Sequence, residues 1–388
     1  MPYSPIRKLV PFADKAKEIG RHVYHLNIGQ PDISTPNTYW HAIEHHGRKV
    51  LEYGPSAGLT SYRKKLIEYY KRFDIQLELD DIIVTTGGSE AIIFALMAIT
   101  DPEDEIIIPE PFYTNYNGFA KEAAAKVVPI TSRIEDDFQL PPIDSIREKI
   151  TSKTRAILIC NPNNPTGYVY SKEELQALRE IVLEYDLFLM ADEVYREFCY
   201  DGLRHTSVMH LSGIDDRSIL LDSISKRYSA CGARIGCVIS KNHDITNTAL
   251  KFGMARLCPP TLGQLGAEAG IDTPVSYFQE VLEEYTERRN VMVDALRKMP
   301  GVTAPNPKGA FYLVARLPVD DAEKFASWLL TDFHVDGETT MVAPANGFYS
   351  TEGLGRDEVR IAYVLNVDDI RKAMHILAEG LKAYPGRK

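Results

Sequence analysis

The chain contains 388 residues, of which 44% are hydrophobic and 25% are charged. This composition is typical of a globular protein and excludes disorder, collagen and coiled coil for the whole chain. The length predicts two or three folded units, or one large unit with a lobe. Acidic residues outnumber basic ones by 54 to 44, so at a net charge of −10 the basic surface of a nucleic-acid-binding protein is missing.

The cysteines indicate a reducing compartment. Their number is odd and no two form a C-x-x-C pair; they are Cys160, Cys199, Cys231, Cys237 and Cys258. We therefore expect neither a disulfide framework nor a metal site. The first residues include Pro2 and Pro5 and lack the apolar core of a secretory signal, and the longest apolar run, Ala91–Ile99, is about half of a bilayer span. The sequence therefore predicts a cytoplasmic protein.

Short apolar runs alternate with amphipathic segments through most of the chain. The first 45 residues are an exception, since they are rich in proline and show little periodicity, and we interpret them as an arm and linker. Seven later runs read as buried strands: Ile82–Thr85, Glu105–Pro109, Lys126–Ile130, Arg155–Cys160, Leu187–Ala191, Ser218–Asp222 and Ile235–Ser240. Continuous apolar strands that alternate with helices predict a largely parallel sheet covered on both faces.

Ser171–Tyr185 is the clearest of the intervening helices. Its opening, Ser171-Lys-Glu-Glu174, matches a capping box. The apolar residues that follow at helical spacing predict one buried face; they are Leu175, Leu178, Ile181 and Val182.

The pattern changes after about residue 275 and predicts a second, smaller α/β lobe. Ser276–Lys298 reads as one long charged helix that ends at Met299-Pro300-Gly301. Two strands, Phe311–Arg316 and Val359–Val364, and two helices, near Asp321–Phe333 and Asp368–Ala383, are expected beyond it.

Residues that follow the predicted strands are candidates for a ligand site, because ligands bind beyond the carboxyl ends of strands in open α/β sheets. After the first strand, Gly87 and Gly88 precede a helix whose free N–H groups favour a phosphate, although a tight turn is the alternative. After the fourth strand, Asn161–Gly167 forms a rigid loop, for which a cis bond at Pro162 or Pro165 is one option. The alternative for that loop is simple punctuation before the next helix.

Three ionisable residues follow two other strands. Asp192 would be costly at the end of a buried strand without a cationic partner, unless it caps a helix. Lys226 is a candidate amine nucleophile and Arg234 a candidate phosphate ligand, with solvated surface positions as the alternatives. Taken together at one sheet edge, these features suggest an anionic aromatic cofactor joined covalently to Lys226.

At these residues the sequence resembles the fold-type I pyridoxal-phosphate enzymes, and specifically the class I/II aminotransferases. The resemblance extends over essentially the whole chain, from Asn27-Ile-Gly-Gln-Pro-Asp32 through Tyr53-Gly-Pro to Val359-Arg-Ile-Ala-Tyr363. It implies an α/β fold with a large domain, built on a mostly parallel seven-stranded sheet, and a smaller α/β domain. The expected boundaries are an arm and part of the small domain at 1–45, the large domain at 46–280 and the small domain at 281–388.

The resemblance also implies a cofactor, pyridoxal 5'-phosphate, and residues that contact its ring. Lys226 resembles the lysine that bonds covalently to the cofactor, and Asp192 matches the aspartate that pairs with the ring nitrogen. Asn164 and Tyr195 match residues that hydrogen-bond the ring oxygen, and Tyr113 resembles the aromatic residue that stacks on the ring. An ionised Asp192 would keep the ring nitrogen protonated, and Lys226 would carry a proton to and from the substrate.

The remaining implied roles concern the phosphate and the substrate. The residues that match the phosphate cradle are Gly87, Gly88, Ser89, Ser223 and Arg234. Tyr53 resembles a tyrosine that reaches the phosphate of the neighbouring subunit in a homodimer. Arg360 matches the arginine that binds the substrate α-carboxylate, with Asn164 beside it, and Gly29 lies where the backbone meets the same group.

One position departs from the pattern of aspartate-using relatives. Some bacterial members carry a lysine where this chain has Ser89, and that lysine helps to hold the second carboxylate of the substrate. No clear replacement is visible in the first residues, although Arg7, Lys8 and Lys15 are available. Aspartate therefore stays open as the amino donor, alongside aromatic, methionine-like and other neutral amino acids.

The leading hypothesis is an aminotransferase that moves the amino group of an L-amino acid to a 2-oxo acid, with 2-oxoglutarate expected, by a ping-pong route. A C–S β-lyase of the same fold is the alternative, because sequence motifs barely separate the two. A third hypothesis is a regulator that binds the cofactor without turnover. Such regulators place a DNA-binding domain before this fold, whereas here about 45 residues precede the large domain and the charge is acidic.

Overall fold

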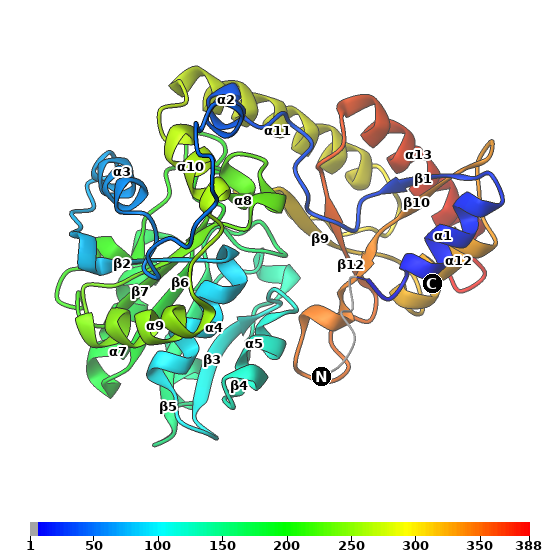
Figure 1. The fold of residues 1–388 in the computed structure, drawn as a ribbon. Helices are drawn as coiled ribbons and strands as arrows, with labels where there is room; N and C mark the ends of the chain where they lie inside the picture. The colour runs from blue at the N-terminus through cyan, green and yellow to red at the C-terminus, as the bar shows by residue number, and fades with distance from the viewer. Residues whose placement is uncertain (1–6) are drawn as a thin grey trace.

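The computed structural model describes residues 7–388; residues 1–6, with Pro2 and Pro5, lie outside the described residues. The chain forms two lobes (Figure 1). The large lobe contains a seven-stranded sheet, and the small lobe contains the remaining strands. Helix α11 (Val275–Arg297) begins beside the large lobe and runs to the small one (Figure 1). The boundaries 1–45, 46–280 and 281–388 remain a proposal, and the last falls inside this helix.

The seven-stranded sheet confirms every strand predicted for it, each within one residue at either end. In spatial order its strands are β2 (Ile82–Thr85), β8 (Gly236–Ile239), β7 (Ser218–Ser223), β6 (Phe188–Asp192), β5 (Thr154–Cys160), β3 (Glu105–Glu110) and β4 (Lys126–Thr131). Strand β8 runs antiparallel to both of its neighbours, and the other pairs are parallel. The sheet is therefore mostly parallel, as expected from its continuous apolar strands.

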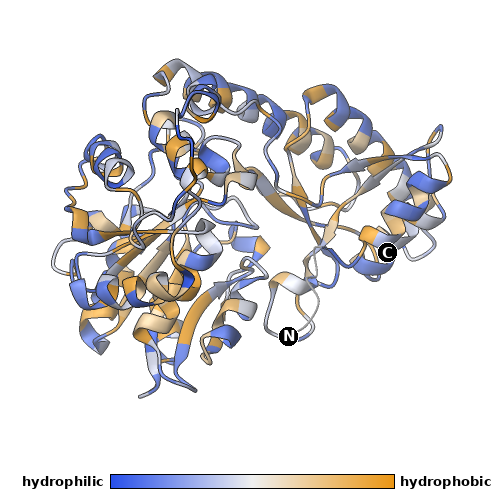
Figure 2. Ribbon diagram, in the orientation of Figure 1, coloured by the Kyte–Doolittle hydropathy of each residue, from blue (hydrophilic) through white to orange (hydrophobic). Residues whose placement is uncertain are grey.

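Both faces of this sheet are covered. Successive side chains of β5 enter different apolar clusters, since Leu158 packs on one side while Ile157 packs on the other with Leu178 of α7 (Lys172–Tyr185). Figure 2 shows these central strands as largely hydrophobic. Helix α7 has the predicted capping box, in which the Glu174 amide donates to Ser171 Oγ at 3.1 Å and the Ser171 amide donates to Glu174 Oε2 at 2.7 Å. Its predicted face is buried: Leu175, Leu178, Ile181 and Val182.

The small lobe contains two further sheets. A three-stranded antiparallel sheet has the order β11 (Ala343–Pro344), β12 (Glu358–Ala362) and β9 (Tyr312–Arg316). Beside it, β1 (His22–His25) pairs in parallel with β10 (Glu338–Met341). The helices of this lobe are α1 (Val10–Glu18), α12 (Ala322–Thr331) and α13 (Val367–Ala383). The arm interpretation therefore missed α1 and β1, which stabilise the small lobe from a distant part of the chain.

The remaining helices belong to the large lobe. They are α2 (Asn37–Glu44), α3 (Thr60–Lys71), α4 (Gly87–Ile99), α5 (Tyr116–Glu122), α6 (Ile143–Arg147), α8 (Ile224–Arg227), α9 (His243–Arg256) and α10 (Thr261–Gly270). Within residues 7–388 no helix combines the length and the apolar character that a bilayer crossing requires. All five cysteines are free thiols.

Candidate active site

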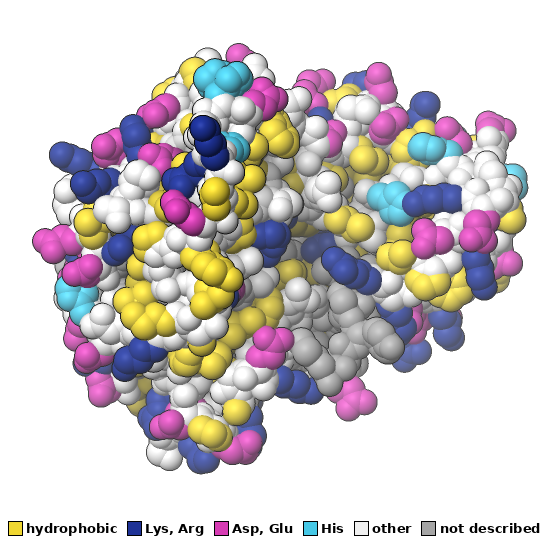
Figure 3. All heavy atoms as spheres, viewed as in Figure 1, with side chains coloured by type: hydrophobic (Ala, Val, Ile, Leu, Met, Phe, Trp, Pro, Cys, Tyr) yellow, Lys and Arg dark blue, Asp and Glu magenta, His cyan; other side chains and the backbone are white. Residues whose placement is uncertain are grey.

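A cavity of about 520 Å³ lies between the lobes, where β5, β6 and β7 end and α4 begins. This volume suits a small-molecule cofactor with a substrate. Figure 3 shows Lys and Arg side chains in the hollow between the lobes. Nearly all of the predicted site residues line the cavity: Gly29, Gly88, Ser89, Tyr113, Asn164, Asp192, Tyr195, Ser223, Lys226, Arg234 and Arg360.

Two predicted residues do not line it. Gly87 lies directly behind the wall, where an added Cβ would be 2.4 Å from Arg234 Nη2. Tyr53 is 79% exposed on the surface of the large lobe and contributes nothing to the cavity of its own chain.

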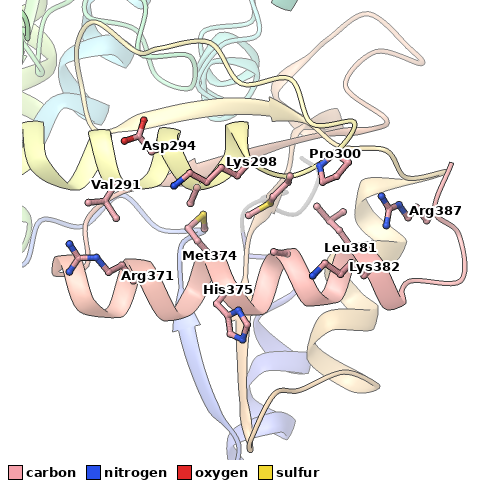
Figure 4. A pocket seen from close by; sticks show the side chains of 13 residues that line it. Val291, Asp294, Lys298, Pro300, Arg371, Met374, His375, Leu381, Lys382 and Arg387 are labelled. Carbon is pink, nitrogen blue, oxygen red and sulfur yellow. The ribbon is translucent and has the colours of Figure 1, made fainter.

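A second cavity, of about 470 Å³, lies in the small lobe between α11 and α13 (Figure 4). Its floor is apolar and its cations are dispersed, since Arg371 and Arg387 lie at opposite ends in Figure 4. Arg371 is also paired with Asp368 at 3.0 Å. Because the carboxylate and the amines that line this second cavity, Asp294, Lys298 and Lys382, are all exposed, the cavity between the lobes is the candidate active site.

Lys226 lies in α8, one short turn beyond the end of β7. Its Nζ is half-buried and donates a hydrogen bond to the Gly29 carbonyl at 2.8 Å. The Cys231 thiol, which the sequence analysis did not single out, lies 3.8 Å from the same nitrogen. The amine is therefore held inside the cavity by a neutral backbone acceptor, and no carboxylate among the described residues forms an ion pair with it.

Asp192 ends β6 and is 6% exposed. Burial raises the pKa of this carboxyl to about 6, against hydrogen bonds from the Tyr116 hydroxyl at 2.8 Å and the Val194 amide at 3.4 Å, which lower it. No described arginine or lysine forms an ion pair with it, although the charge of nearby Lys226 also lowers its pKa, so the buried carboxylate suits a further cationic partner. A protonated ring nitrogen fits this position.

Arg360 of β12 is 2% exposed, which excludes the surface position that the sequence left open. Its Nη1 donates to Asn164 Oδ1 at 3.1 Å and its Nη2 donates to the Asn27 carbonyl. Its Nε is buried without a hydrogen-bond partner in the described structure. Arg360 lines the cavity, and the paired N–H donors of a guanidinium are well suited to a carboxylate ligand.

Tyr312 of β9 is a further residue of the site that sequence reasoning missed. Its hydroxyl lies 2.9 Å from that of Tyr195 and donates to the Gly29 carbonyl at 3.4 Å. Its ring lies under the Arg360 guanidinium, with 4.6 Å between the guanidinium carbon and the ring centroid. A Cβ at Gly29 would lie 1.7 Å from this hydroxyl, so the absence of a side chain there permits the contact.

The first turn of α4 forms the opposite end of the cavity. Gly87 and Gly88 lie inside this turn rather than before it, and Thr86, the N-cap, makes no side-chain capping bond. The helix therefore presents backbone N–H groups and the positive end of its dipole toward an anion. Gly87 has a φ of +78° and lets Arg234 approach closely. A phosphate fits this arrangement.

Beneath the site, buried charges hold the turn that carries Lys226. Arg227 pairs with Asp222, and its Nε donates to Glu197 Oε1 at 2.6 Å. The Tyr70 hydroxyl donates to Asp222 Oδ2 at 2.6 Å. The Asn161–Gly167 loop on the other side has cis bonds before both Pro162 and Pro165. The contacts of Arg227 and Asp222 hold in place the turn that carries Lys226.

The two-lobed α/β fold, with a lysine after β7 and a buried aspartate at the end of β6, is that of the fold-type I enzymes. The family model described as "Aminotransferase class I and II" matches residues 21–377, and the chain belongs to this family. It is an aminotransferase, an enzyme that moves an amino group between an amino acid and a 2-oxo acid.

Three similar proteins illustrate the range of the family. An aspartate aminotransferase of Pyrococcus horikoshii is 32% identical over 98% of this chain and 95% of its own. The aromatic-amino-acid aminotransferase 2 of Thermococcus litoralis is 29% identical over 98% of this chain and 96% of its own. The structure of Thermus thermophilus aspartate aminotransferase with maleate has a TM-score of 0.88 and 27% identity, covering 98% of this chain and 97% of that one.

Proposed function

We propose that the chain binds pyridoxal 5'-phosphate in the cavity between the lobes and uses it to transfer amino groups between L-amino acids and 2-oxo acids. The observation that carries this proposal is the presence of Lys226 and the unpaired, buried Asp192 in one cavity. An amine and a carboxylate in this arrangement suit an aldehyde cofactor with a basic ring nitrogen.

The residues present fit each part of the cofactor. Asp192 would pair with the ring nitrogen, and Tyr113 would stack on the ring. Asn164 and Tyr195 would donate hydrogen bonds to the ring oxygen, and Lys226 would hold the cofactor covalently between turnovers. The phosphate would be bound by Gly87, Gly88, Ser89, Ser223 and Arg234, consistent with the start of α4, where Thr86 makes no side-chain capping bond.

When bound, pyridoxal phosphate supplies an electron sink that makes a substrate Cα–H bond acidic. Lys226 Nζ, held by the Gly29 carbonyl, would then take the proton from Cα and return it in the reverse reaction. Arg360 would bind the α-carboxylate through its guanidinium N–H groups and so orient the Cα–H bond. Asp192 would keep a proton on the ring nitrogen.

The same half-reaction run in reverse would return the amino group to an acceptor, for which 2-oxoglutarate is expected. The two substrates would bind one after the other to the same residues, which gives ping-pong kinetics. None of the described residues that line the cavity favours a C–S β-lyase over an aminotransferase.

A second copy of the chain would complete the site. Tyr53 is exposed outside its own cavity, and other exposed apolar residues lie near it in the sequence or at the end of α9: Val50, Leu51, Met254 and Leu257. The loop that carries Tyr53 lies against α9, since Arg256 Nη2 donates to the Ser56 carbonyl at 3.1 Å. Figure 3 shows hydrophobic side chains gathered on the face of the large lobe that carries α9. We infer a homodimer in which Tyr53 of each protomer reaches its partner's phosphate site.

Covalent trapping tests the cofactor assignment. The purified protein, loaded with pyridoxal phosphate, is reduced with borohydride, digested and mapped by mass spectrometry. The proposal expects one modified peptide, labelled at Lys226, and no label in Lys226→Ala. A label elsewhere, or none, contradicts it.

Measurements of turnover distinguish an aminotransferase from a C–S β-lyase. Amino acids are mixed with the loaded enzyme, and loss of the visible band of the cofactor is followed by stopped flow. An aminotransferase regains the band when a 2-oxo acid is added. Release of pyruvate from cystathionine without any 2-oxo acid would instead support the β-lyase.

Mixed dimers test the shared site. Tyr53→Ala and Lys226→Ala are each expected to be impaired alone. Unfolding and refolding the two together should restore activity, because one site in each mixed dimer then contains both intact residues. Failure to regain activity despite dimer formation by sedimentation would contradict the role of Tyr53.

A further inference from the structure

Arg256, the last residue of α9, is not among the described residues that line the cavity. Its Nη1 lies 3.2 Å from Glu90 Oε2 and donates a hydrogen bond to Thr86 Oγ1 at 3.4 Å. Its Nη2 donates to the Ser56 carbonyl at 3.1 Å. Glu90 and Thr86 belong to the start of α4, and Ser56 belongs to the loop that carries Tyr53. One guanidinium therefore joins the two segments that the proposed function assigns to phosphate binding.

Glu90 brings a negative charge to the helix end where the phosphate would bind. It follows Ser89 directly in α4, and its Oε2 accepts a hydrogen bond from the Thr86 amide at 2.7 Å. Its carboxylate therefore lies at the N-terminal end of the helix, on the same turn as Gly87 and Gly88. The dipole of a helix attracts anions to this end, but two anions that are bound there also repel each other.

Arg256 compensates the charge of Glu90. Among the described residues it is the one arginine or lysine that forms an ion pair with this carboxylate, and the two side chains are 17% and 18% exposed. Because both are largely removed from water, the charge of Glu90 would be poorly screened if Arg256 were replaced by an apolar residue. Arg234, which the proposed function assigns to the phosphate itself, lies against Gly87 instead. The two arginines therefore act on different anions.

The same guanidinium fixes the loop at Ser56. Gly253 of α9 permits the close approach, since an added Cβ there would lie 3.2 Å from both Arg256 Nη2 and the Ser56 carbonyl oxygen. On the neighbouring residue of the loop, the Ala57 carbonyl accepts a hydrogen bond from the Val84 amide of β2 at 3.0 Å. The loop is therefore held between β2 and the end of α9, and Arg256 connects it to the start of α4.

We propose that Arg256 is a positioning residue for the cofactor phosphate, on which it acts from outside the cavity by compensating Glu90 and by holding the Ser56 loop at the start of α4. This inference rests on the proposed function and adds a residue that no motif of the sequence indicates. With Arg256 in place, the phosphate meets a helix end whose own carboxylate is neutralised. Without it, the phosphate and the Glu90 carboxylate repel each other at that end.

The test compares Arg256→Met with Arg179→Met. Arg179 of α7 also pairs with a glutamate, Glu180, and donates to a backbone carbonyl, that of Ser212, and its side chain is 19% exposed. It is not among the described residues that line the cavity, so it is a matched control. The cofactor-free proteins are titrated with pyridoxal phosphate and with pyridoxal, which lacks the phosphate, and binding is followed by absorbance. Glu90→Gln is measured alone and in combination with Arg256→Met.

In Arg256→Met, the dissociation constant for pyridoxal phosphate should rise about tenfold, while that for pyridoxal should change by less than about twofold. Adding Glu90→Gln should recover most of the loss, because glutamine keeps an acceptor for the Thr86 amide and removes the charge. Glu90→Gln alone should bind pyridoxal phosphate about threefold more tightly than wild type, since Arg256 then has no carboxylate to neutralise it. Arg256→Lys should bind it better than Arg256→Met does, and Arg179→Met should bind it as wild type does.

Unchanged affinity for pyridoxal phosphate in Arg256→Met would overturn the inference. Equal losses for pyridoxal phosphate and pyridoxal, or no recovery on adding Glu90→Gln, would also overturn it, since both indicate a purely structural role. If Arg256→Met does not fold, Glu90→Gln alone decides: tighter binding of pyridoxal phosphate but not of pyridoxal supports the inference, and no gain overturns it.

These results are distinct from failure of the proposed function. If the wild-type protein does not bind pyridoxal phosphate and shows no label at Lys226, the proposed function itself fails. If it binds the cofactor and is labelled while Arg256→Met binds as tightly as wild type, only the role of Arg256 is lost.

Discussion

Replacing Asp192 by Asn should stabilise the cofactor-free protein and weaken its complex with the cofactor. Burial raises the pKa of Asp192 from 3.8 to about 6, so at neutral pH the carboxylate is ionised in surroundings that disfavour its charge. The difference between the two pKa values corresponds to about 3 kcal/mol, at about 1.4 kcal/mol for each pH unit.

Proton binding to Asp192 decides whether this group raises or lowers the stability of the folded protein. The folded protein holds the Asp192 proton more tightly than the unfolded chain does, so this group lowers stability as the pH rises from about 4 to about 6. Above that window the cost is complete and constant. The cofactor-free wild type therefore carries this cost at pH 8 and not at pH 4, whereas an amide carries it at neither pH.

Asp192→Asn keeps an acceptor for the Tyr116 hydroxyl without the charge. We expect the cofactor-free variant to be more stable than wild type at about pH 8 by about 1–3 kcal/mol, the lower value reflecting a weaker hydrogen bond to a neutral oxygen. Near pH 4 the two should be alike. Chemical unfolding followed by tryptophan fluorescence measures the difference. A less stable variant at pH 8, or a difference independent of pH, would refute the reasoning.

In the complex with the cofactor, wild type should be the more stable of the two proteins. The variant loses the ion pair with the ring nitrogen, so its dissociation constant for pyridoxal phosphate should rise. In wild type the affinity should fall as the pH drops through about 6, because the carboxyl becomes protonated in the free protein. Absorbance titrations at several pH values measure both effects. An affinity in Asp192→Asn equal to that of wild type would contradict the pairing.

Three further changes test other parts of the site. Gly87→Ala should weaken cofactor binding about tenfold, because a φ of +78° strains an alanine and its Cβ would approach Arg234 Nη2 to 2.4 Å. Absorbance titration measures the affinity, and an unchanged value would contradict close binding of the phosphate at Gly87. Arg227→Met should lower the free energy of unfolding by about 3–5 kcal/mol, because it leaves Asp222 buried without its partner. A change of less than about 1 kcal/mol, similar to that of an ordinary surface substitution, would show that the ion pair is not needed for stability. Arg360→Lys should reduce kcat/KM for all amino donors by about tenfold to a hundredfold, because lysine cannot supply the paired N–H donors; steady-state kinetics with wild-type values would argue against α-carboxylate binding there.

Much of the fold could be predicted because its signals are local. Each strand of the seven-stranded sheet is a short apolar run between polar or turn-forming residues, and these limits agree with the structure within one residue. The helix after Ser171 was equally clear, since its cap and its apolar face are both encoded within fifteen residues, about four turns. By contrast, β1 and β10 are short and partly polar, and neither has a strong pattern of its own.

The candidate site divides in the same way. Gly87, Asp192 and Lys226 could be named because each lies at the end of a recognisable strand or within three residues of it, where an α/β sheet places its ligands. Tyr116 and Tyr312 carried no such signal. Both read as ordinary aromatic residues of a helix and a strand, and their hydroxyls matter only because the fold brings them to Asp192 and to Gly29.

The amino-acid sequence by itself determined which segments become strands and helices and which motifs follow them, because turns, caps and apolar periodicity act over a few residues. Only the tertiary structure decided the strand order, the pairing of β1 with β10 and the unsatisfied Nε of Arg360. It also decided that Arg7 lines the cavity while Lys8 faces α12. These features depend on contacts between distant parts of the chain, which form only when the whole molecule buries its apolar surface.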